Sequence, residues 1–167
     1  MGLQSDRLKL PFLAAAQAQK EMTHNEALVV ADIAMQAVVQ SVAPAAVPAS
    51  PLSGQCWIVG ASPIGAWSGQ AGALAAWTSG GWRFVTPFEG MRAWSIADNV
   101  IVRHTATGWQ VGGLTAAALS IAGQQVVGAR QPKVAAPSGG TTVDQQARTA
   151  LSAVIAGLEA HGLFSSS

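Results

Sequence analysis

The sequence predicts an α+β protein with N-terminal helices, a small antiparallel β meander built from two similar units, and a C-terminal helix. Three observations lead to this fold class. A capping-box sequence precedes an apolar run at residues 23–41. A motif containing tryptophans and a turn glycine occurs twice within residues 66–111. A second capped, Ala-rich stretch lies near the C-terminus.

Charged residues are scarce along this chain. Of its 167 residues, 50% are hydrophobic and 10% are charged, whereas roughly 25% are charged in ordinary soluble domains. From Ile33 through Trp82 there is no Asp, Glu, Lys or Arg. Water solvates such a stretch poorly unless other surfaces cover it. We therefore expect a homo-oligomer rather than a monomer. Within the particle considered below, either a trimer or a pentamer would fit.

Composition also argues against several classes of protein. The net charge of +1 gives no electrostatic footprint for nucleic acid. We expect no membrane span, because no apolar run reaches about 18 residues. The apolar stretch after Lys9 is short and is broken by Pro11, unlike a secretory signal. Cys56 is the only cysteine, which excludes an internal disulfide, and its apolar neighbours indicate a buried thiol.

Residues 1–42 are expected to form an arm followed by helices. The first residues are polar enough to be flexible, and the Ala/Gln-rich residues 12–22 favour helix. Thr23 and Glu26 then match a capping box, which opens a second helix. This helix is expected to reach about Ser41 and, because its apolar face is so wide, to be buried on most sides.

A linker and a duplicated β module are expected next. Residues 43–53 carry three prolines among Ala and Ser, which predicts an extended linker. The β module follows over residues 54–113, and a fixed offset within it is typical of a duplicated supersecondary unit. The pairs separated by 27 residues are Ala66 with Ala93, Trp67 with Trp94, Ser68 with Ser95, Thr78 with Thr105, Gly81 with Gly108, and Trp82 with Trp109.

Each copy of the repeat is expected to contain a hairpin. In the first copy, a four-residue turn with two glycines would set Trp77 opposite Trp82 as a cross-strand aromatic pair. In the second copy, a turn at residues 98–99 would set Trp94 opposite Arg103, so that the guanidinium stacks on the indole. The module would then be a meander of short strands.

The remaining chain predicts a connector and an assembly helix. Residues 114–140 are expected to be β or extended, with a hairpin within residues 118–129. Residues 141–167 hold the C-terminal oligomerisation helix, which Thr142 would cap and Gly162 would end. From Ala147 onward its apolar residues follow a 4, 3, 4 spacing suited to a short bundle. The residues expected at assembly surfaces are Leu28, Met35, Leu151, Val154 and Leu158.

The sequence shows no constellation of catalytic residues. The three histidines are scattered, and no pair has the i, i+4 spacing of a helical zinc site. Glu89 and Asp98 are the acidic residues of the β module, and Asp98 is already explained as a turn residue. Neither a nucleophile elbow nor a phosphate loop is present. We expect no enzyme activity, no metal site and no cofactor.

Six tryptophans and no tyrosine raise the question of a ligand surface. Exposed indoles with arginines beside them would suit a glycan-binding module that contacts the host cell surface or capsule. The alternative is that a small module rich in Ala and Val uses its tryptophans as core, since each buries a large area. The candidate glycan contacts are Trp67, Trp94, Arg92 and Arg103.

Residues 10–28, LPFLAAAQAQKEMTHNEAL, resemble the opening of an uncharacterised domain family of alphaproteobacterial prophage and gene-transfer-agent structural proteins, which are associated with fibres or spikes. The most specific motifs are QAQK at 17–20 and THNEAL at 23–28. The likeness continues through the Pro/Ala stretch and the tryptophan motifs. It covers roughly residues 8–112.

The C-terminal part is similar to the final piece of many phage fibre proteins. The resemblance rests on GARQP at 128–132 and on the last helix, which closes in AHGL. Members of that group often carry a basic residue before the terminal histidine. This chain has Glu159 and Ala160 there, so no role of the last turn carries over.

The resemblance implies a virion component of a phage-like particle, synthesised in the cytoplasm. Such a component would be a fibre or spike protein. Because the chain ends soon after its connector segments, we expect a homo-oligomeric base or connector that anchors a spike or fibre, with attachment at a capsid vertex favoured over the tail. The implied partners are further copies of the chain, a capsid or tail protein, and a spike or fibre protein. Host surface polysaccharide is the additional partner of the alternative glycan-binding hypothesis.

Overall fold

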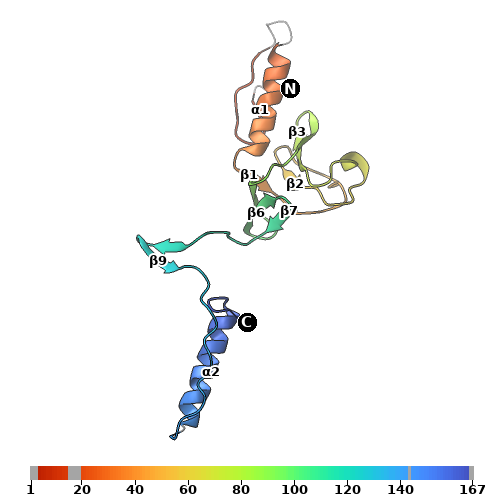
Figure 1. Ribbon diagram of the computed structural model, residues 1–167. Helices are drawn as coiled ribbons and strands as arrows, with labels where there is room; N and C mark the ends of the chain where they lie inside the picture. Colours follow the sequence, from red (N-terminus) through yellow and green to blue (C-terminus); the bar gives the residue numbers. More distant parts are fainter. Residues whose placement is uncertain (1–3, 15–19, 143, 166–167) are drawn as a thin grey trace. The chain divides into compact units, whose positions relative to one another are not determined.

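The computed structural model describes residues 4–14, 20–142 and 144–165. It confirms the α+β class, with a helix near the N-terminus, several small sheets of mainly antiparallel strands, and a helix near the C-terminus (Figure 1). The chain divides into two compact units, Met1–Gly113 and Leu114–Ser167. The division follows Gly113, the last residue of the predicted β module.

The first unit contains two three-stranded meanders. One consists of β2 (Cys56–Ile58), β3 (Leu74–Thr78) and β4 (Gly81–Val85), all antiparallel. Its strands are joined by a long loop carrying the 3₁₀ turn η1 (Gly65–Trp67) and by a short hairpin turn. The predicted pairing of Trp77 with Trp82 is confirmed.

The second meander consists of β5 (Arg92–Ser95), β6 (Val100–Thr105) and β7 (Gly108–Val111), again antiparallel. A fourth strand, β1 (Ala37–Val39), joins this sheet in parallel beside β5. The two meanders are antiparallel as predicted, and β1, which comes from a stretch predicted to be helical, adds a parallel strand. It arrives by a long crossover, as parallel strands require.

The second half of the repeat forms the same hairpin in both meanders. Thr78 Oγ1 donates to Gly81 O at 2.7 Å, and Thr105 Oγ1 donates to Gly108 O at 2.9 Å. Both glycines have positive φ, +94° and +110°, which side chains disfavour. Trp109 pairs with His104 as Trp82 pairs with Trp77, so β3–β4 and β6–β7 are two copies of one hairpin.

The first half of the repeat is not equivalent in space. Trp67 lies in the loop between β2 and β3, residues 59–73, whereas Trp94 lies within β5. The corresponding β5–β6 turn is only residues 96–99, so the second meander has no counterpart of that loop. Leu74 and Ile101 are equivalent positions of the two copied hairpins. Leu74 pairs with Ile58 and Ile101 pairs with Trp94, so the structural counterpart of Trp94 is Ile58 and not Trp67.

The predicted register of the second hairpin is wrong. Trp94 pairs with Ile101, and Arg103 pairs with Arg92 instead of with Trp94. The turn contains four residues instead of two, because Ser95 is the last paired residue of β5. Its hydroxyl donates to the Asp98 carboxylate at 2.6 Å, which stabilises the wider turn.

Helix α1 (Lys20–Ala34) begins earlier and ends earlier than predicted. Thr23 lies inside the helix, so it is no N-cap. Gln36 has φ +48°, and β1 begins at the next residue. The β-branched valines of β1 that widened the apolar helical pattern are buried or half-buried in the sheet instead.

Of the helix expected at residues 12–22, residues 12–14 are neither helix nor strand, whereas residues 20–22 form the start of α1. The backbone N–H and C=O of Leu13 both bond to the side chain of Asn25, at 2.9 and 3.0 Å. Residues 15–19 of this prediction lie outside the described part of the chain. An amide side chain thus supplies the partners that a helix would have given Leu13.

Residues 4–9, the described part of the polar arm, make specific contacts with the rest of the first unit. Ser5 is buried, and its hydroxyl donates to the carboxylate of Asp32 at 2.9 Å. The Asp6 carboxylate accepts from the backbone N–H of Ser79, in the β3–β4 turn. Residues near the start of the chain therefore connect α1 to the first meander.

The proline-rich stretch at residues 43–53 has neither helix nor strand, as predicted. It is nevertheless packed, because Pro44 and Ala45 accept backbone hydrogen bonds from Gly60 and Ile64. At Gly60 an added Cβ would lie 2.6 Å from the carbonyl oxygen of Ala43. Only glycine permits that close approach.

The main core of the first unit joins α1 to both sheets. Its buried residues come from α1, β1, β2, β3, β6 and the start of the second meander, and they are Val29, Ile33, Ala37, Val39, Cys56, Ile58, Leu74, Ala76, Met91, Ala93 and Val102. A second cluster of buried tryptophans covers the opposite face of β2 and β3. Strands β2 and β3 are therefore buried on both faces, whereas every residue of β4 is half-buried.

The second unit consists of a hairpin and a helix. Strands β8 (Leu119–Ile121) and β9 (Gln124–Val127) pair through a turn in which Ala122 and Gly123 both have positive φ. The predicted hairpin is therefore present, within residues 118–129 as expected. Helix α2 (Gln145–Ala160) is capped by Asp144, whose carboxylate accepts from the N–H of Ala147, and not by Thr142. Gly162, at φ +74°, follows its C-terminus as predicted.

Candidate functional site

All six tryptophans lie in the described part of the chain, and most of them are core residues. Trp57, Trp67, Trp77 and Trp82 form one cluster, with ring centroids of contacting pairs 5.1 to 6.2 Å apart. Most pairs meet edge to face, the arrangement that the aromatic quadrupole favours. Trp67 has no exposed surface. It therefore does not belong to any surface that could contact a glycan.

Trp109 joins the second meander to the first. Its indole N–H donates to the carbonyl of Gly72 at 2.8 Å, and its ring meets His104 edge to face at 5.2 Å. The indole is half-buried against the main core. Trp109 is therefore explained by packing.

Trp94 differs from the other five tryptophans because 40% of its surface is exposed. Alternate residues of β5 point to opposite faces, so Ala93 and Ser95 are buried while Arg92 and Trp94 are exposed. The paired registers place Arg103 and Ile101 on the same face as Arg92 and Trp94. We call this surface the open face of the β1–β5–β6–β7 sheet.

The open face carries two rows of side chains that run across the strands. One row is apolar and consists of Val38, Trp94 and Ile101, which are register partners on β1, β5 and β6. The other row is polar and consists of Arg92, Arg103 and Gln110, on β5, β6 and β7. The polar row and the row that contains Trp94 are thus neighbours on the same face.

The structure brings together three of the four predicted glycan contacts. Arg92, Trp94 and Arg103 share the open face, whereas Trp67 lies in the buried cluster. Sequence reasoning missed Ile101 and Gln110, the register partners of Trp94 and Arg103. The alternation of side chains along each strand would place Ile101 and Gln110 on this face. That prediction needs the pairing register, which depends on the length of the turn.

The predicted assembly residues fall in both units. Leu28 on α1 is half-buried, and Met35, directly after α1, is exposed. On α2, Leu151 and Val154 are more than half exposed, and Leu158 is half-buried. None of the described residues of the second unit is buried.

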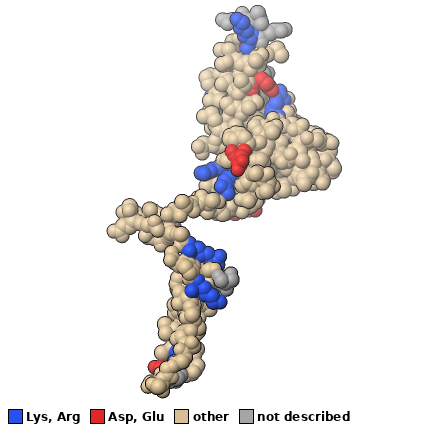
Figure 2. Space-filling view, in the orientation of Figure 1, with Lys and Arg blue, Asp and Glu red and all other residues tan. Residues whose placement is uncertain are grey.

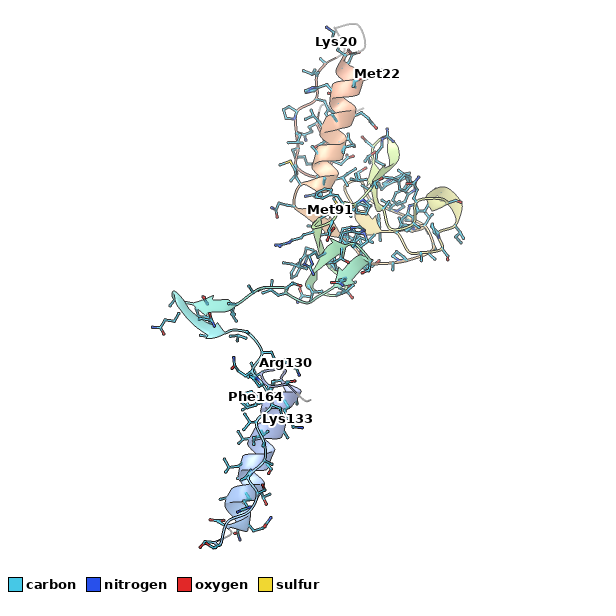
Figure 3. The ribbon with its side chains drawn as sticks, viewed as in Figure 1. Lys20, Met22, Met91, Arg130, Lys133 and Phe164 are labelled. Atoms are coloured by element: carbon cyan, nitrogen blue, oxygen red, sulfur yellow. The ribbon has the colours of Figure 1, made fainter. Side chains whose placement is uncertain are left out.

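Charge is sparse on the face drawn in Figure 2, where uncharged residues dominate both units. Within α2 the charged residues are Arg148 and Glu159 alone. Arg148 donates to the carbonyls of Pro137 and Gly139 before the helix. At the other end of α2, Arg130 lies beside Phe164 (Figure 3), and its Nε donates to the Phe164 carbonyl at 2.9 Å.

Metal-ligating side chains do not cluster in the described ranges. These ranges contain no group of three or more His, Cys, Asp or Glu residues placed to hold a metal ion. Burial raises the pKa of the Cys56 thiol to about 12, which keeps it protonated and a poor nucleophile. In the same residues, no helix is long and apolar enough to cross a membrane.

Comparison with known protein families assigns the first unit. A family described as "Protein of unknown function (DUF2793)" matches residues 24–110, which is more than half of the chain. The chain belongs to the DUF2793 family. A comparison with curated proteins finds no match.

The DUF2793 match contains the structural features that define the first unit. It begins within α1 and ends within β7, so it covers both meanders and the open face. Two of its first residues hold α1 in place: Asn25 bonds to Leu13, and Glu26 forms a salt bridge with Arg83 of β4. The hairpin and helix of the second unit lie outside the DUF2793 match.

Proposed function

We propose that this protein is a homo-oligomeric structural component of a phage-like particle, a base or connector that anchors a spike or fibre. The observation that carries the proposal is the exposure of the second unit, in which no described residue is buried. A segment with helix and hairpin but no core of its own needs another surface to stabilise it. Further copies of the chain are the simplest source of that surface.

Both elements of the second unit are too short to be stable on their own in water. Helix α2 has 16 residues, and isolated helices of about 12–15 residues are marginal in water. A lone two-stranded hairpin such as β8–β9 is also marginal at best. On α2, Leu151, Val154 and Leu158 follow the spacing of a bundle seam and retain exposed apolar surface. Packing this seam against its copies would stabilise the helix.

The assignment to a particle rests on the sequence. The QAQK and THNEAL motifs resemble prophage and gene-transfer-agent structural proteins, and the C-terminal part resembles phage fibre ends. Within THNEAL, Asn25 and Glu26 make long-range contacts, so the motif has a structural role in this fold. We favour a capsid vertex over the tail as the attachment point, with a spike or fibre protein as the distal partner.

The assembly proposal is tested by the mass of the purified full-length protein. Native mass spectrometry and light scattering at micromolar concentration are expected to give a trimer or a pentamer. Replacing Leu151 and Val154 by Ser should shift the population toward monomer. The matched control is Gln146→Ser, also on the exposed surface of α2. A monomer for the unaltered chain would contradict the proposal.

The particle proposal needs a separate experiment. Antibody labelling of purified particles from the producing cells, viewed by electron microscopy, is expected to mark capsid vertices. Loss of the gene should remove the spikes while leaving filled capsids. Particles that keep their spikes without this protein would rule out a role as their base, whatever its oligomeric state.

A further inference from the structure

We propose that three copies of His161 hold a divalent transition-metal ion such as Zn²⁺ on the axis of a three-stranded bundle of α2 helices. This inference rests on the homo-oligomer proposed above and assigns a ligand site that forms only between copies. It begins from the spacing of the α2 seam. Leu151, Val154 and Leu158 are separated by three and then four residues, and His161 follows Leu158 by three more. The histidine therefore takes the next position of the same seam.

His161 keeps helical geometry although α2 itself ends at Ala160. Its φ and ψ are −74° and −6°, in the right-handed helical region. Its backbone N–H donates to the carbonyl of Gly157 at 3.0 Å, which continues the i to i−4 ladder of the helix. Residues three and four apart on a helix share a face, so His161 lies on the face of Leu158 and Val154.

The imidazole of His161 is exposed and available to a ligand. Among the residues that the structure describes, no group forms a hydrogen bond or an ion pair with its ring. The seam residues before it, Leu151 and Val154, are also more than half exposed. The same face of α2 thus offers an apolar stripe and, at its C-terminal end, an unpaired imidazole.

The residue types along the seam favour three strands over five. Counted in heptads, Leu151 and Leu158 take the a position, and Val154 takes the d position. Leucine at a with a β-branched residue at d shifts coiled coils from two strands to three or four. Closed cyclic symmetry places equivalent residues at one level, so the helices run parallel. The three His161 side chains then meet in one layer.

Three imidazoles in one layer match the ligand set of a tetrahedral transition-metal site. Zn²⁺ accepts three histidine nitrogens at roughly 2.0–2.1 Å and takes water as its fourth ligand. The C-terminal end of a helix carries partial negative charge, so three parallel C-terminal ends favour a cation there. The described residues of a single chain supply no such cluster. The site is therefore complete only in the assembled protein.

Two other roles of His161 fit less well. As a packing residue, an imidazole facing the axis would be a polar ring without a partner, which is costly in an apolar layer. As three separate cations, the imidazoles of one layer would repel each other. A metal ion resolves both, because neutral imidazole nitrogens are its ligands. Arg130 adds a positive charge at this end of α2, where its Nε donates to the Phe164 carbonyl (Figure 3), so coordination to nitrogen has to hold the ion.

The test is native mass spectrometry of the full-length protein, which reports oligomer mass and bound metal together. The protein is stripped with EDTA and dialysed, and Zn²⁺ is then added in slight excess. Mg²⁺, which prefers oxygen ligands, is the negative control. We expect a trimer that carries a single Zn²⁺ and no bound Mg²⁺. Zn²⁺ should also lower the protein concentration at which the trimer dissociates, because it binds only the assembled form.

The variants separate metal binding from assembly. His161→Asn should keep the trimer and lose the bound Zn²⁺, because the amide stays polar but no longer offers an imidazole nitrogen. The matched control is His24→Asn, which changes another exposed helical histidine and should keep both trimer and metal. If His161→Asn does not assemble, diethyl pyrocarbonate gives the readout on the unaltered chain. Zn²⁺ is then expected to protect His161 from modification and to leave His24 reactive.

Failure of the metal site and failure of the assembly proposal give different results. A trimer without Zn²⁺, or one whose Zn²⁺ survives in His161→Asn, would show that His161 is not the ligand. One Zn²⁺ per chain would place the ion on residues of a single copy. A pentamer would exclude the three-stranded site and leave the homo-oligomer standing. A monomer would contradict the assembly proposal itself.

Discussion

Arg7 closes the C-terminal end of helix α1. Its guanidinium donates to the carbonyls of Asp32, Ile33, Met35 and Gln36, while its backbone N–H donates to the Asp32 carboxylate. The last carbonyls of a helix lack intrahelical partners and carry partial negative charge. A cation from the arm thus satisfies four acceptors at once, and the arm becomes part of the folded unit.

Removal of this cap should destabilise the first unit. We expect Arg7→Ala to lower the free energy of unfolding by about 1–3 kcal/mol, because partly buried carbonyls lose a charged donor. Urea unfolding followed by circular dichroism measures the change. Lys9→Ala removes a neighbouring cation with a single exposed backbone contact and should shift the midpoint little. Equal effects of the two substitutions would show that Arg7 has no special role.

Cys56 should be inert in the folded protein. Burial raises the pKa of its thiol from the ordinary 9.0 to about 12, and only the thiolate reacts quickly. A disulfide reagent at pH 8 is expected to modify Cys56 only after denaturant is added. Rapid modification of the native protein would contradict this burial.

The same pKa difference gives a pH dependence of stability. The folded state holds its proton more tightly than the unfolded state, so the contribution is complete below pH 9 and decreases as pH rises from 9 toward 12. The loss is at most about 1.4 kcal/mol per pH unit. Cys56→Ser, compared at pH 8 and pH 10.5, should show a smaller decrease than the unaltered chain. Parallel decreases in the two proteins would assign the pH effect to other groups.

At the scale of elements, the tryptophan cluster and the open face predict opposite behaviour for two tryptophans. Trp82 contacts three other indoles, whereas Trp94 is 40% exposed. We expect Trp82→Ala to cost about 3–5 kcal/mol of stability, as for other large-to-small core substitutions. Trp94→Ala should lower the free energy of unfolding far less, because Trp94 is already partly exposed. Thermal or urea unfolding measures both changes. A larger loss at Trp94 would mean that the open face is covered in solution.

The elements that could be predicted are those specified locally. The hairpin turn after β3 follows from Thr78 and Gly81, and its copy after β6 follows from Thr105 and Gly108. The end of α1 could not be predicted in this way, because the valines of β1 continue the apolar helical spacing. They form a strand only by pairing with β5, whose residue Ala93 is 56 positions beyond Ala37. Tertiary pairing outweighs a local pattern there.

The candidate site shows the same limit. Residue types alone identified Trp94, Arg92 and Arg103, which do share one face. They could not separate Trp94 from Trp67, because both follow Ala and precede Ser. The difference lies in the loop before β3, which buries Trp67 and has no counterpart before β6. The length of the loop decides which of the two tryptophans is exposed, and the repeated motif does not contain that information.

At the scale of the whole molecule, the two units should differ in how they depend on concentration. The first unit has its own buried core, whereas the second has no buried residue in its described part. A protein truncated after Gly113 is expected to fold, to unfold independently of concentration, and to be monomeric. The full-length protein should lose helicity of the second unit on dilution. A truncated protein that keeps the full-length oligomeric state would move the assembly surface to the first unit.

The segment that begins with β1 joins both meanders. Ala37–Val39 pairs with β5, and the residues that follow pair with β2 through Gln40 with Cys56 and Ala43 with Ile58. Both meanders therefore form hydrogen bonds to this one segment. Neither meander can separate from the other unless some of these hydrogen bonds break. The first unit should consequently open in a single cooperative transition. Amide hydrogens of Gln40 and Ala43 should exchange only through that global opening, as slowly as the most protected amides of the central strands.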